Sequence, residues 1–440
     1  MTQNFSNCSL DKSLEQWLSY LETIHNSEID LGLTRIKLVG KKLNIDLGFA
    51  TVITVAGTNG KGTTCAFLEN ALMAEGNHLS HNNPLHNITH QQSVAVYSSP
   101  HIEHFNERLR INKQDVSDEL LVEAFEQIEA VREDTSLTYY EYTTLAAFLV
   151  LMKVRPDFII LEVGLGGRLD ATNMIDADIA VITTIDLDHQ SFLGNNREVI
   201  GYEKAGIMRP NKFAVLGDTN PTESVQTYAK EINADIKIRK KDFTIEQESE
   251  EGLWQWCYKN ITLKKLTAPF IPQDNVATAL MALSLLNIDL TTEKVNNIIE
   301  NTKVAGRTEM FEDRCHVLLD VAHNPQAARH LAQYINEQKT LNNYQRVVAV
   351  VGVLEDKDIT NILAPMTEIV EHWYLGGLPV PRSATSALIA EKLTPYTSLF
   401  NCFDNVTQAF KMANSNRDKN DLIIVFGSFY TVAEIRRLFV

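Results

Sequence analysis

The sequence predicts an α/β protein with a P-loop-type parallel-sheet ATPase domain over residues 1–300 and a smaller Rossmann-like domain over residues 306–440. Apolar β-branched runs alternate with helical runs, and glycine and polar residues gather where the strands end. This arrangement is typical of parallel sheets. A glycine-rich turn joins an early strand to a helix, and the alternation restarts after a linker over 300–306. The second block, of roughly 135 residues, can therefore bury its own core.

Composition limits the class of protein. The 440 residues are 44% hydrophobic and 22% charged, as in ordinary globular enzymes. A net charge of −16 argues against non-specific nucleic-acid binding, which needs a basic face. The polar first ten residues and the short apolar runs predict a cytoplasmic protein without membrane contact. An odd number of cysteines without metal-binding spacing fits a reducing compartment, and they are Cys8, Cys65, Cys257, Cys315 and Cys402.

The periodicity of the sequence predicts the order of the elements. Helices are expected over 13–25, from about 34 to 43, and over 65–75, 119–131, 142–153, 198–207 and 275–286. Strands are expected over 51–55, 94–97, 158–163, 179–185, 316–321, 346–353, 373–375 and 422–426. The segment 213–272 is predicted to be antiparallel or peripheral. For the His-rich stretch 77–93, a solvated loop is favoured over a metal site, because its histidines are irregularly spaced without acidic or thiol partners.

The stretch Gly57–Thr63 (GTNGKGT) lies between a strand and a helix and has the composition of a phosphate-binding loop. Backbone N–H groups, the helix dipole and the Lys61 ammonium would act on one anionic site. The stretch departs from the ordinary P-loop pattern, because its first glycine is closer to Lys61 and Gly62 separates Lys61 from Thr63. We predict a nucleotide-phosphate site here, with a glycine-rich turn that binds no ligand as the alternative.

Glu162 ends a fully apolar strand. A carboxylate at such a position is costly unless it is paired or bound to a metal, and ligands of parallel sheets bind at strand ends. Magnesium takes oxygen ligands, usually a hydroxyl, a carboxylate and substrate phosphates. We therefore predict that Glu162 and the Thr63 hydroxyl bind magnesium, with a structural salt bridge of Glu162 as the alternative.

Three further residues are weak candidates when they are considered alone. Ser99 ends a neighbouring strand and is a turn residue before a proline. His189 ends another strand, where a histidine is more often structural than a metal ligand. Lys204 lies on a predicted helix, and its spacing alone indicates an exposed lysine.

The second domain contains its own strand-end candidates. Asp320 ends a strand and His323 opens the following helix, so both could contact a phosphate or acyl phosphate. Helix capping by His323 is an equal alternative. Arg307 follows the linker, where two domains would meet. ATP bound there would need a cation to stabilise the transferring phosphoryl group.

The residues together resemble the folylpolyglutamate synthase family, which is related to the Mur ligases. The shared motifs are Gly57–Thr63 (GTNGKGT), Ser98–His101 (SSPH), Leu161–Asn173 (LEVGLGGRLDATN), Leu187–His189 (LDH), Glu203–Ile207 (EKAGI), Asp320–Pro325 (DVAHNP) and Gly427–Phe429 (GSF). The resemblance covers essentially the whole chain. Three further stretches resemble the bacterial bifunctional dihydrofolate synthase/folylpolyglutamate synthase branch, namely Asp30–Leu33 (DLGL), Thr138–Glu141 (TYYE) and Pro381–Ala384 (PRSA).

The resemblance implies roles for particular residues. ATP would be bound by Thr58, Asn59, Gly60, Lys61, Gly62, Thr63, Asn275, Arg307 and Asp320. Dihydropteroate would be bound by Leu31, Gly32, Leu33, Thr138, Tyr139, Tyr140, Glu141, Leu169, Asp170 and Ala171. Two magnesium ions would be held by Thr63, Ser99, Glu162, His189 and Lys204. Lys204 would be carbamylated, because a carbamate converts a cationic amine into an anionic oxygen ligand. The resemblance thus raises Ser99, His189 and Lys204 to strong candidates.

The implied activity is ATP-dependent ligation of L-glutamate to dihydropteroate and to folates through an acyl phosphate, with Lys61 and His323 as catalytic residues. Only small-molecule partners and a monomer are expected. A Mur-type ligase acting on a UDP-sugar peptide is one alternative. Gly62, the block 165–173 and the nearness of the phosphate loop to residue 1 favour the folate branch. A P-loop nucleotide switch is the other alternative, and it would need no second substrate pocket.

Overall fold

The computed structural model describes residues 12–27, 29–74, 92–248, 252–311 and 316–440. The stretch 77–93, which was predicted to be a solvated loop, falls mostly outside these ranges. Cys8 and Cys315 also lie outside them. The chain forms two compact units. Residues up to 101 together with 105–302 make the first, and residues 102–104 together with 303–440 make the second. The sequence predicted one continuous first domain over residues 1–300, and it gave no sign that residues 102–104 belong to the second unit.

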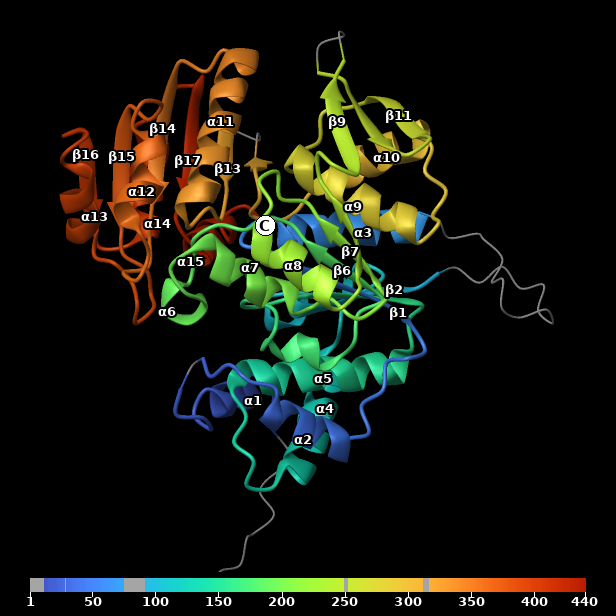
Figure 1. Ribbon diagram of the computed structural model, residues 1–440. Coiled ribbons are helices and arrows are strands. Elements are labelled where there is room, and N and C mark those ends of the chain that lie inside the picture. Colours follow the sequence, from blue (N-terminus) through green and yellow to red (C-terminus); the bar gives the residue numbers. More distant parts are fainter. Residues whose placement is uncertain (1–11, 28, 75–91, 249–251, 312–315) are drawn as a thin grey trace, which may run out of the picture. The chain divides into compact units, whose positions relative to one another are not determined.

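The first unit is built on an eight-stranded sheet (Figure 1). Six neighbouring strands run parallel, and at one edge a seventh strand pairs antiparallel with them and an eighth pairs antiparallel with the seventh. In sheet order the strands are β4 (Gln114–Asp115), β3 (Leu109–Ile111), β2 (Val94–Tyr97), β5 (Phe158–Glu162), β1 (Thr51–Ala56), β6 (Ile179–Ile182), β7 (Phe213–Leu216) and β8 (Asp235–Ile238). The central strands β2, β5, β1 and β6 are buried almost throughout. Continuous apolar runs are therefore expected in them, because helices cover both faces of such sheets.

Helices cover the sheet of the first unit. Their bounds are α1 (Leu14–Leu21), α2 (Thr34–Lys42), α3 (Lys61–Ala74), α4 (Asp118–Arg132), α5 (Tyr139–Val154), α6 (Gln190–Leu193), α7 (Arg197–Ala205), α8 (Glu223–Glu231), α9 (Gln273–Leu285) and α10 (Thr292–Asn301). Figure 1 shows α1, α2, α4 and α5 gathered beside one face, where Trp17, Phe125 and Phe148 are fully buried in one core. Helix α3 packs against α9 and against strands β1, β2 and β5.

Local sequence signals explain several helix boundaries. At α1 and α5, the pairs Ser13 with Gln16 and Thr138 with Glu141 form capping boxes, which satisfy backbone N–H groups at the helix start. Helix α5 consequently begins at Tyr139, three residues before the predicted start. Helix α3 begins at Lys61 rather than at the predicted residue 65, so the phosphate loop itself forms the first turn.

Two sequence predictions for the end of the first unit were wrong in part. The segment 213–272 does contain a three-stranded antiparallel sheet, made of β9 (Phe243–Gln247), β10 (Trp254–Tyr258) and β11 (Ile261–Leu266). Strands β7 and β8 of the same segment instead continue the parallel sheet, because α8 supplies a crossover. Helix α10 extends to Asn301, into the predicted linker.

The second unit is a six-stranded sheet between two layers of helices. In sheet order its strands are β12 (Glu309–Phe311), β13 (His316–Leu319), β17 (Asp421–Phe426), β14 (Arg346–Val351), β15 (His372–Gly376) and β16 (Phe400–Phe403). Only β12 is antiparallel to its neighbour. One face packs on α11 (Pro325–Asn342), α12 (Ile359–Leu363) and α13 (Ser386–Leu393), and the other on α14 (Val406–Ser415) and α15 (Phe429–Arg436).

Alternation along the strands of the second unit separates its two cores. Val347 and Ala349 of β14 belong to the core under α11, whereas Val348 and Val350 belong to the core under α14. Successive side chains of a strand point to opposite faces. Both units are therefore α/β folds with mainly parallel sheets, and the predicted fold class is confirmed. Within the described ranges, no helix is both long and apolar enough to cross a bilayer.

Candidate active site

The order of strands in the first unit brings the predicted phosphate and metal residues to one edge. Strands β2, β5, β1 and β6 are consecutive and parallel. Their carboxyl ends lead into Ser99, Glu162, the phosphate loop and the loop of His189, respectively. Carboxyl ends of neighbouring parallel strands lie at the same edge of a sheet, where α/β proteins bind ligands. Residues that are up to about 130 positions apart in sequence thus share one edge.

Hydrogen bonds fix the phosphate loop to the end of β6. The backbone N–H of Thr58 donates to Thr184 O at 2.8 Å, and that of Asn59 donates to Thr184 Oγ1 at 3.0 Å. The Thr58 hydroxyl donates to Asp186 O at 3.0 Å and accepts from the Asp186 N–H at 2.9 Å. The side chain of Thr58, a predicted ATP ligand, therefore joins the phosphate loop to the loop that carries His189.

The first turn of α3 contains Lys61 and Thr63. The Lys61 ammonium donates to Gly57 O at 3.0 Å, so the lysine folds back over the loop. The Thr63 hydroxyl donates to Gly60 O at 3.0 Å and accepts from Asn275 Nδ2 at 2.8 Å. Asn275, from α9, is buried. In this structure Asn275 contacts the hydroxyl predicted to bind magnesium, which gives it a positioning role in the loop.

Replacing Gly60 by alanine is expected to weaken ATP binding by at least about tenfold, which corresponds to about 1.4 kcal/mol. Gly60 has φ +83°, and a Cβ atom there would lie 2.5 Å from Asn275 Oδ1. The variant combines backbone strain with a clash in the loop. Isothermal titration with a non-hydrolysable ATP analogue measures the change.

Gly252→Ala is the matched control for Gly60→Ala. Gly252 also has a positive φ of 78°, but a Cβ atom there would meet nothing within 4 Å. Gly252→Ala should lower the stability of the protein through backbone strain, but it should leave the affinity for the ATP analogue unchanged. Equal affinities of both variants for the analogue would contradict the role assigned to Gly60.

Glu162 lies against the phosphate loop. It is only 6% exposed, and a Cβ atom at Gly62 would lie 3.7 Å from its Oε2. Burial, with a contribution from the charge of Glu162, raises the pKa of the Cys65 thiol well above its ordinary value. A carboxylate and the Thr63 hydroxyl at one loop are hard oxygen donors, which suit magnesium. In the described part of the chain, no three His, Cys, Asp or Glu side chains gather as a ready metal cluster.

Lys204 is buried, at 3% exposure, in the last turn of α7. The interpretation as an exposed helix lysine is therefore wrong, because α7 turns this side chain inward. Burial and the positive charge of Lys61 lower the pKa of the Lys204 amine to about 7, although Asp188 and Asp170 oppose the shift. A second cation close to Lys61 in a buried position is unfavourable. An amine that can lose its charge at neutral pH fits this position better.

Ser99 and His189 lie in loops at the same edge of the sheet. The preceding hydroxyl, of Ser98, accepts a hydrogen bond from Arg110 at 3.2 Å, and Arg110 also pairs with buried Glu69 at 3.0 Å. This network fixes the turn in which Ser99 lies. His189 is exposed, has φ 49° and precedes α6. An exposed imidazole is available to ligands, and the Asp188 carboxylate lies 4.0 Å from its Nε2.

The three predicted dihydropteroate segments differ in whether their side chains make contacts within the protein. Asp170 is buried and accepts from the N–H groups of Leu165 and Thr172, at 2.9 and 3.0 Å, so it shapes its own loop. Burial, with the charge of Asp170, raises the pKa of Tyr140 well above its ordinary value. At Gly32 an added Cβ atom would meet nothing within 4 Å. The packing of the chain thus does not require glycine at position 32, which leaves space for a ligand.

Leu31, Leu33, Tyr139 and Leu169 are partly exposed apolar or aromatic residues, whereas Thr138, Glu141 and Ala171 are buried. Oε2 of Glu141 accepts from the Thr138 N–H at 2.8 Å within the capping box. Among the described residues, Oε1 of Glu141 is buried without a hydrogen-bond partner. A buried acceptor of this kind costs free energy unless it meets a donor.

The second unit places its predicted residues around Phe429. The Arg307 guanidinium lies 5.2 Å from the centre of that ring, and the His323 ring lies 5.7 Å from it. Asp320 accepts from the N–H groups of Thr308 and Ala322, at 2.9 and 2.8 Å. Burial raises the pKa of Asp320, and the charge of Arg307 opposes this shift. Sequence reasoning used Phe429 only as part of a motif and did not find this packing role.

The capping alternative for His323 is wrong, because Asn324 caps α11 by accepting from the Ala327 N–H at 2.9 Å. His323 Nδ1 is 2.9 Å from Val321 O. A carbonyl can only accept, so Nδ1 carries a proton and the neutral ring has its lone pair on Nε2. In this tautomer Nε2 can accept a proton, and it can donate to an anion only once it is protonated.

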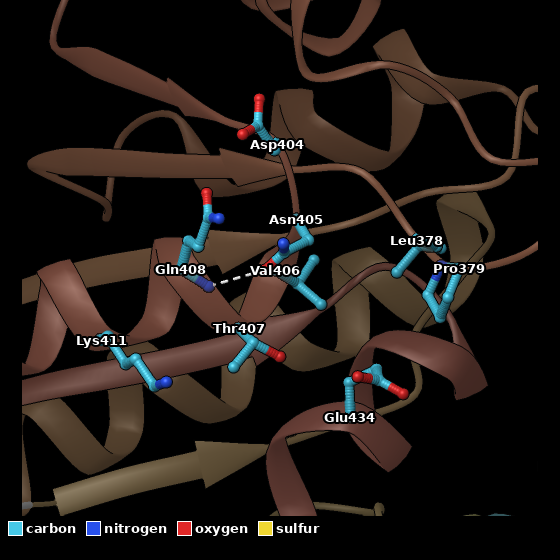
Figure 2. A pocket seen from close by; sticks show the side chains of 9 residues that line it. All are labelled: Leu378, Pro379, Asp404, Asn405, Val406, Thr407, Gln408, Lys411 and Glu434. Carbon is cyan, nitrogen blue, oxygen red and sulfur yellow. Dashed lines mark hydrogen bonds between the residues drawn. The ribbon is translucent and has the colours of Figure 1, made fainter.

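The second unit also has a pocket of about 540 Å³ beside the start of α14 (Figure 2). None of the predicted site residues lines it. The lining residues are Leu378, Pro379, Asp404, Asn405, Val406, Thr407, Gln408, Lys411 and Glu434. Asn405 caps α14 through the Gln408 N–H at 2.9 Å, so its amide oxygen is already used.

Comparison with known families matches both units. Residues 55–286 match the Mur ligase middle domain, and residues 306–429 match the Mur ligase, glutamate ligase domain. Among curated proteins, the Escherichia coli dihydrofolate synthase/folylpolyglutamate synthase is 40% identical, over 96% of this chain and 94% of that protein.

Solved structures agree. Escherichia coli FolC in complex with DHPP and ADP has a TM-score of 0.88 and 40% identity, over 97% of both chains. The bifunctional folylpolyglutamate synthase/dihydrofolate synthase of Yersinia pestis, complexed with AMPPNP and Mn, has a TM-score of 0.88 and 39% identity, over 98% of this chain and 99% of that one.

The fold and the phosphate loop define an ATP-dependent ligase of the Mur ligase class. Within that class, the chain belongs to the dihydrofolate synthase/folylpolyglutamate synthase family. The predicted family and the predicted enzyme class are confirmed, and the folate branch prevails over a UDP-sugar ligase and over a nucleotide switch.

Proposed function

We propose that this chain ligates L-glutamate to 7,8-dihydropteroate, which gives dihydrofolate, and to folates, which gives folylpolyglutamates. The observation that carries the proposal is the phosphate loop at the same sheet edge as buried Glu162, with buried Lys204 near enough for the charge of Lys61 to lower its pKa. Family membership supports it, together with the DHPP and ADP bound to the Escherichia coli relative and the AMPPNP and Mn bound to the Yersinia pestis relative.

The reaction needs activation, because a carboxylate is a poor electrophile. The pteroate carboxylate attacks the γ-phosphorus of ATP, the bond to the β-phosphate oxygen breaks, and an acyl phosphate and ADP form. The glutamate amine then attacks the acyl carbon, loses a proton, and inorganic phosphate leaves. Lys61 and the N–H groups of residues 58–63 would stabilise the negative charge on the transferring phosphoryl group.

The proposed metal site consists of Thr63, Ser99, Glu162, His189 and Lys204. The hydroxyl and carboxylate oxygens at the phosphate loop fit magnesium, and a further anionic oxygen ligand would fit it equally well. Bound magnesium would neutralise phosphate charge and polarise the phosphoryl group.

A carbamate on Lys204 would supply such an anionic oxygen ligand. The neutral Lys204 amine attacks carbon dioxide, a C–N bond forms and a proton is lost, which gives an N-carboxylate. The pKa of about 7 makes a large share of the amine neutral near pH 7. The positive charge of Lys61 would then attract the modified side chain instead of repelling it. Carbamylation is the form of Lys204 that best fits its buried place.

Reactivation of a decarbamylated enzyme by bicarbonate should fall as the pH falls below 7. Because the pKa of the Lys204 amine is lowered to about 7, about half of the amine is neutral at pH 7 and only about a tenth at pH 6. Protein stripped of carbon dioxide would be incubated at one dissolved carbon dioxide concentration at several pH values. Activity is then assayed at a single pH. Equal recovery at pH 6 and pH 8 would contradict the carbamate.

The dihydropteroate site is proposed at residues 31–33, 138–141 and 169–171. The open space at Gly32 and the unpartnered Oε1 of Glu141 support it, since dihydropteroate carries N–H donors and a flat ring.

In the second unit, Arg307 and Asp320 are proposed to bind ATP. His323 is proposed to accept the proton of the glutamate amine at its Nε2 lone pair, or to orient the acyl phosphate by donating to it once Nε2 is protonated. We further propose a cytoplasmic monomer whose partners are small molecules.

Phosphate release tests the proposed function. Purified protein would be incubated with ATP, magnesium and L-glutamate in the presence of 7,8-dihydropteroate, of tetrahydrofolate, or of neither. The masses of the products would be determined by mass spectrometry. Release and glutamate addition with both pterins would support the bifunctional ligase. Activity with one pterin would restrict the function to that step, and no pterin-dependent release would overturn it.

A further inference from the structure

Arg35 connects two of the segments proposed to bind dihydropteroate. It lies on the first turn of α2, directly after the loop 30–33. Its NH1 donates to Asp30 Oδ2 and its NH2 to Asp30 O, both at 2.6 Å. Its Nε donates to Glu141 Oε2 at 3.2 Å, across 106 positions of sequence. One guanidinium group thus holds the start of the 30–33 loop against the start of α5.

Each partner of Arg35 is itself fixed. Glu141 is buried and closes the capping box of α5 through Thr138. Asp30 also lies 3.4 Å from His25 Nε2. Helix α2, by contrast, has no side-chain cap on its first turn, because its N-cap residue is Leu33. The hydrogen bonds that Arg35 donates to Asp30 join the loop to the first turn of α2.

We propose that Arg35 is a positioning residue for the pteroyl substrate. It holds the loop 30–33 and the Glu141 carboxylate in the arrangement that the substrate meets, so that binding does not have to order them. This inference rests on the proposed dihydropteroate site and adds a residue that the family resemblance did not assign. Preformed loops favour binding because less conformational entropy is lost in the complex.

The chemistry of the side chain explains why arginine is suited to this place. A guanidinium offers five N–H donors in a rigid plane and stays charged, so it serves a carboxylate, a second carboxylate and a carbonyl at once. A lysine ammonium is a single point charge on a flexible stem. It could keep one of the three contacts, and its variant should lie between the unaltered protein and an alanine variant.

Two measurements on the full chain test this role. In the first, 7,8-dihydropteroate is titrated into the protein with a non-hydrolysable ATP analogue present. Arg35→Ala should raise the dissociation constant about ten- to a hundredfold, and Arg35→Lys should raise it less. Affinity for the analogue alone should stay within about twofold. In steady-state assays the loss should fall on KM for dihydropteroate more than on kcat.

The second measurement is hydrogen exchange of the ligand-free protein. Backbone amides over 29–36 and 139–142 should exchange faster in Arg35→Ala, while those of the phosphate loop should not change. This readout does not depend on any substrate, so it separates the hold on the loop from the proposed function.

Arg346→Ala is the matched control. Arg346 also bonds a buried carboxylate, Asp421, and a backbone carbonyl, Asn416 O at 2.9 Å, but it lies in the second unit. It should leave dihydropteroate affinity unchanged. Unchanged exchange or unchanged dihydropteroate affinity in Arg35→Ala would overturn the inference, as would an equal loss of analogue affinity. Failure of the unaltered protein to bind dihydropteroate would instead overturn the proposed function on which it rests.

Discussion

Replacing Lys204 by alanine is expected to lower kcat about 10³-fold, the range seen when a preorganised electrostatic group is removed from an active site. The buried Lys204 would supply an anionic ligand as its carbamate, and alanine cannot. Lys204→Arg keeps a positive charge but forms no comparable carbamate, so it should be equally impaired. Phosphate release with dihydropteroate, ATP and glutamate measures both variants.

The carbamate itself has a direct readout. Unaltered protein equilibrated with ¹³C-bicarbonate should show one carbamate carbon signal that is missing from Lys204→Ala. Acetate or propionate should restore part of the activity of Lys204→Ala, because a small carboxylate can occupy the vacated volume. Lys230→Ala is the control, since this exposed lysine lies in the last turn of the neighbouring helix α8. Full activity of Lys204→Arg would refute the proposed ligand.

Replacing Lys61 by methionine should lower kcat by at least about 10³-fold, because the γ-phosphoryl group would lose the cation that stabilises its negative charge during transfer. Methionine keeps the length and apolar stem of the side chain, so α3 should still form. A second effect is expected at Lys204. The charge of Lys61 helps to lower the pKa of Lys204, so its removal should raise that pKa and reduce the neutral amine.

Single-turnover assays and the ¹³C signal separate the two effects of Lys61→Met. Lys61→Arg keeps a charge near Lys204 and should preserve the carbamate signal while it lowers the rate, because its planar group does not match the ammonium. A rate for Lys61→Met within tenfold of the unaltered protein would exclude Lys61 from phosphoryl transfer. An unchanged carbamate signal in Lys61→Met would show that the two lysines are not coupled.

The sequence predicted most of the fold because its signals are local and periodic. The apolar run before Gly57 and the one that ends in Glu162 are central strands in the structure, buried at every residue but the first. Two helix starts were predicted too late, because a capping box at Thr138 and Glu141 and a phosphate loop each add a turn that apolar spacing does not show. For β7 and β8 the antiparallel alternative was wrong and the peripheral one holds, since they form the parallel edge of the sheet; short strands look alike whether they pair in parallel or antiparallel fashion.

By itself, the sequence determined the class of chemistry, since GTNGKGT, the carboxylate of Glu162 and the ordered motifs need no coordinates to be recognised. Only the tertiary structure decided which side of α7 faces inward, and so buried Lys204 near the charge of Lys61. It also brought Arg35 to Glu141 and placed both His323 and Arg307 beside Phe429. Burial and charge proximity arise from packing between distant segments, and periodicity along the chain does not contain that information.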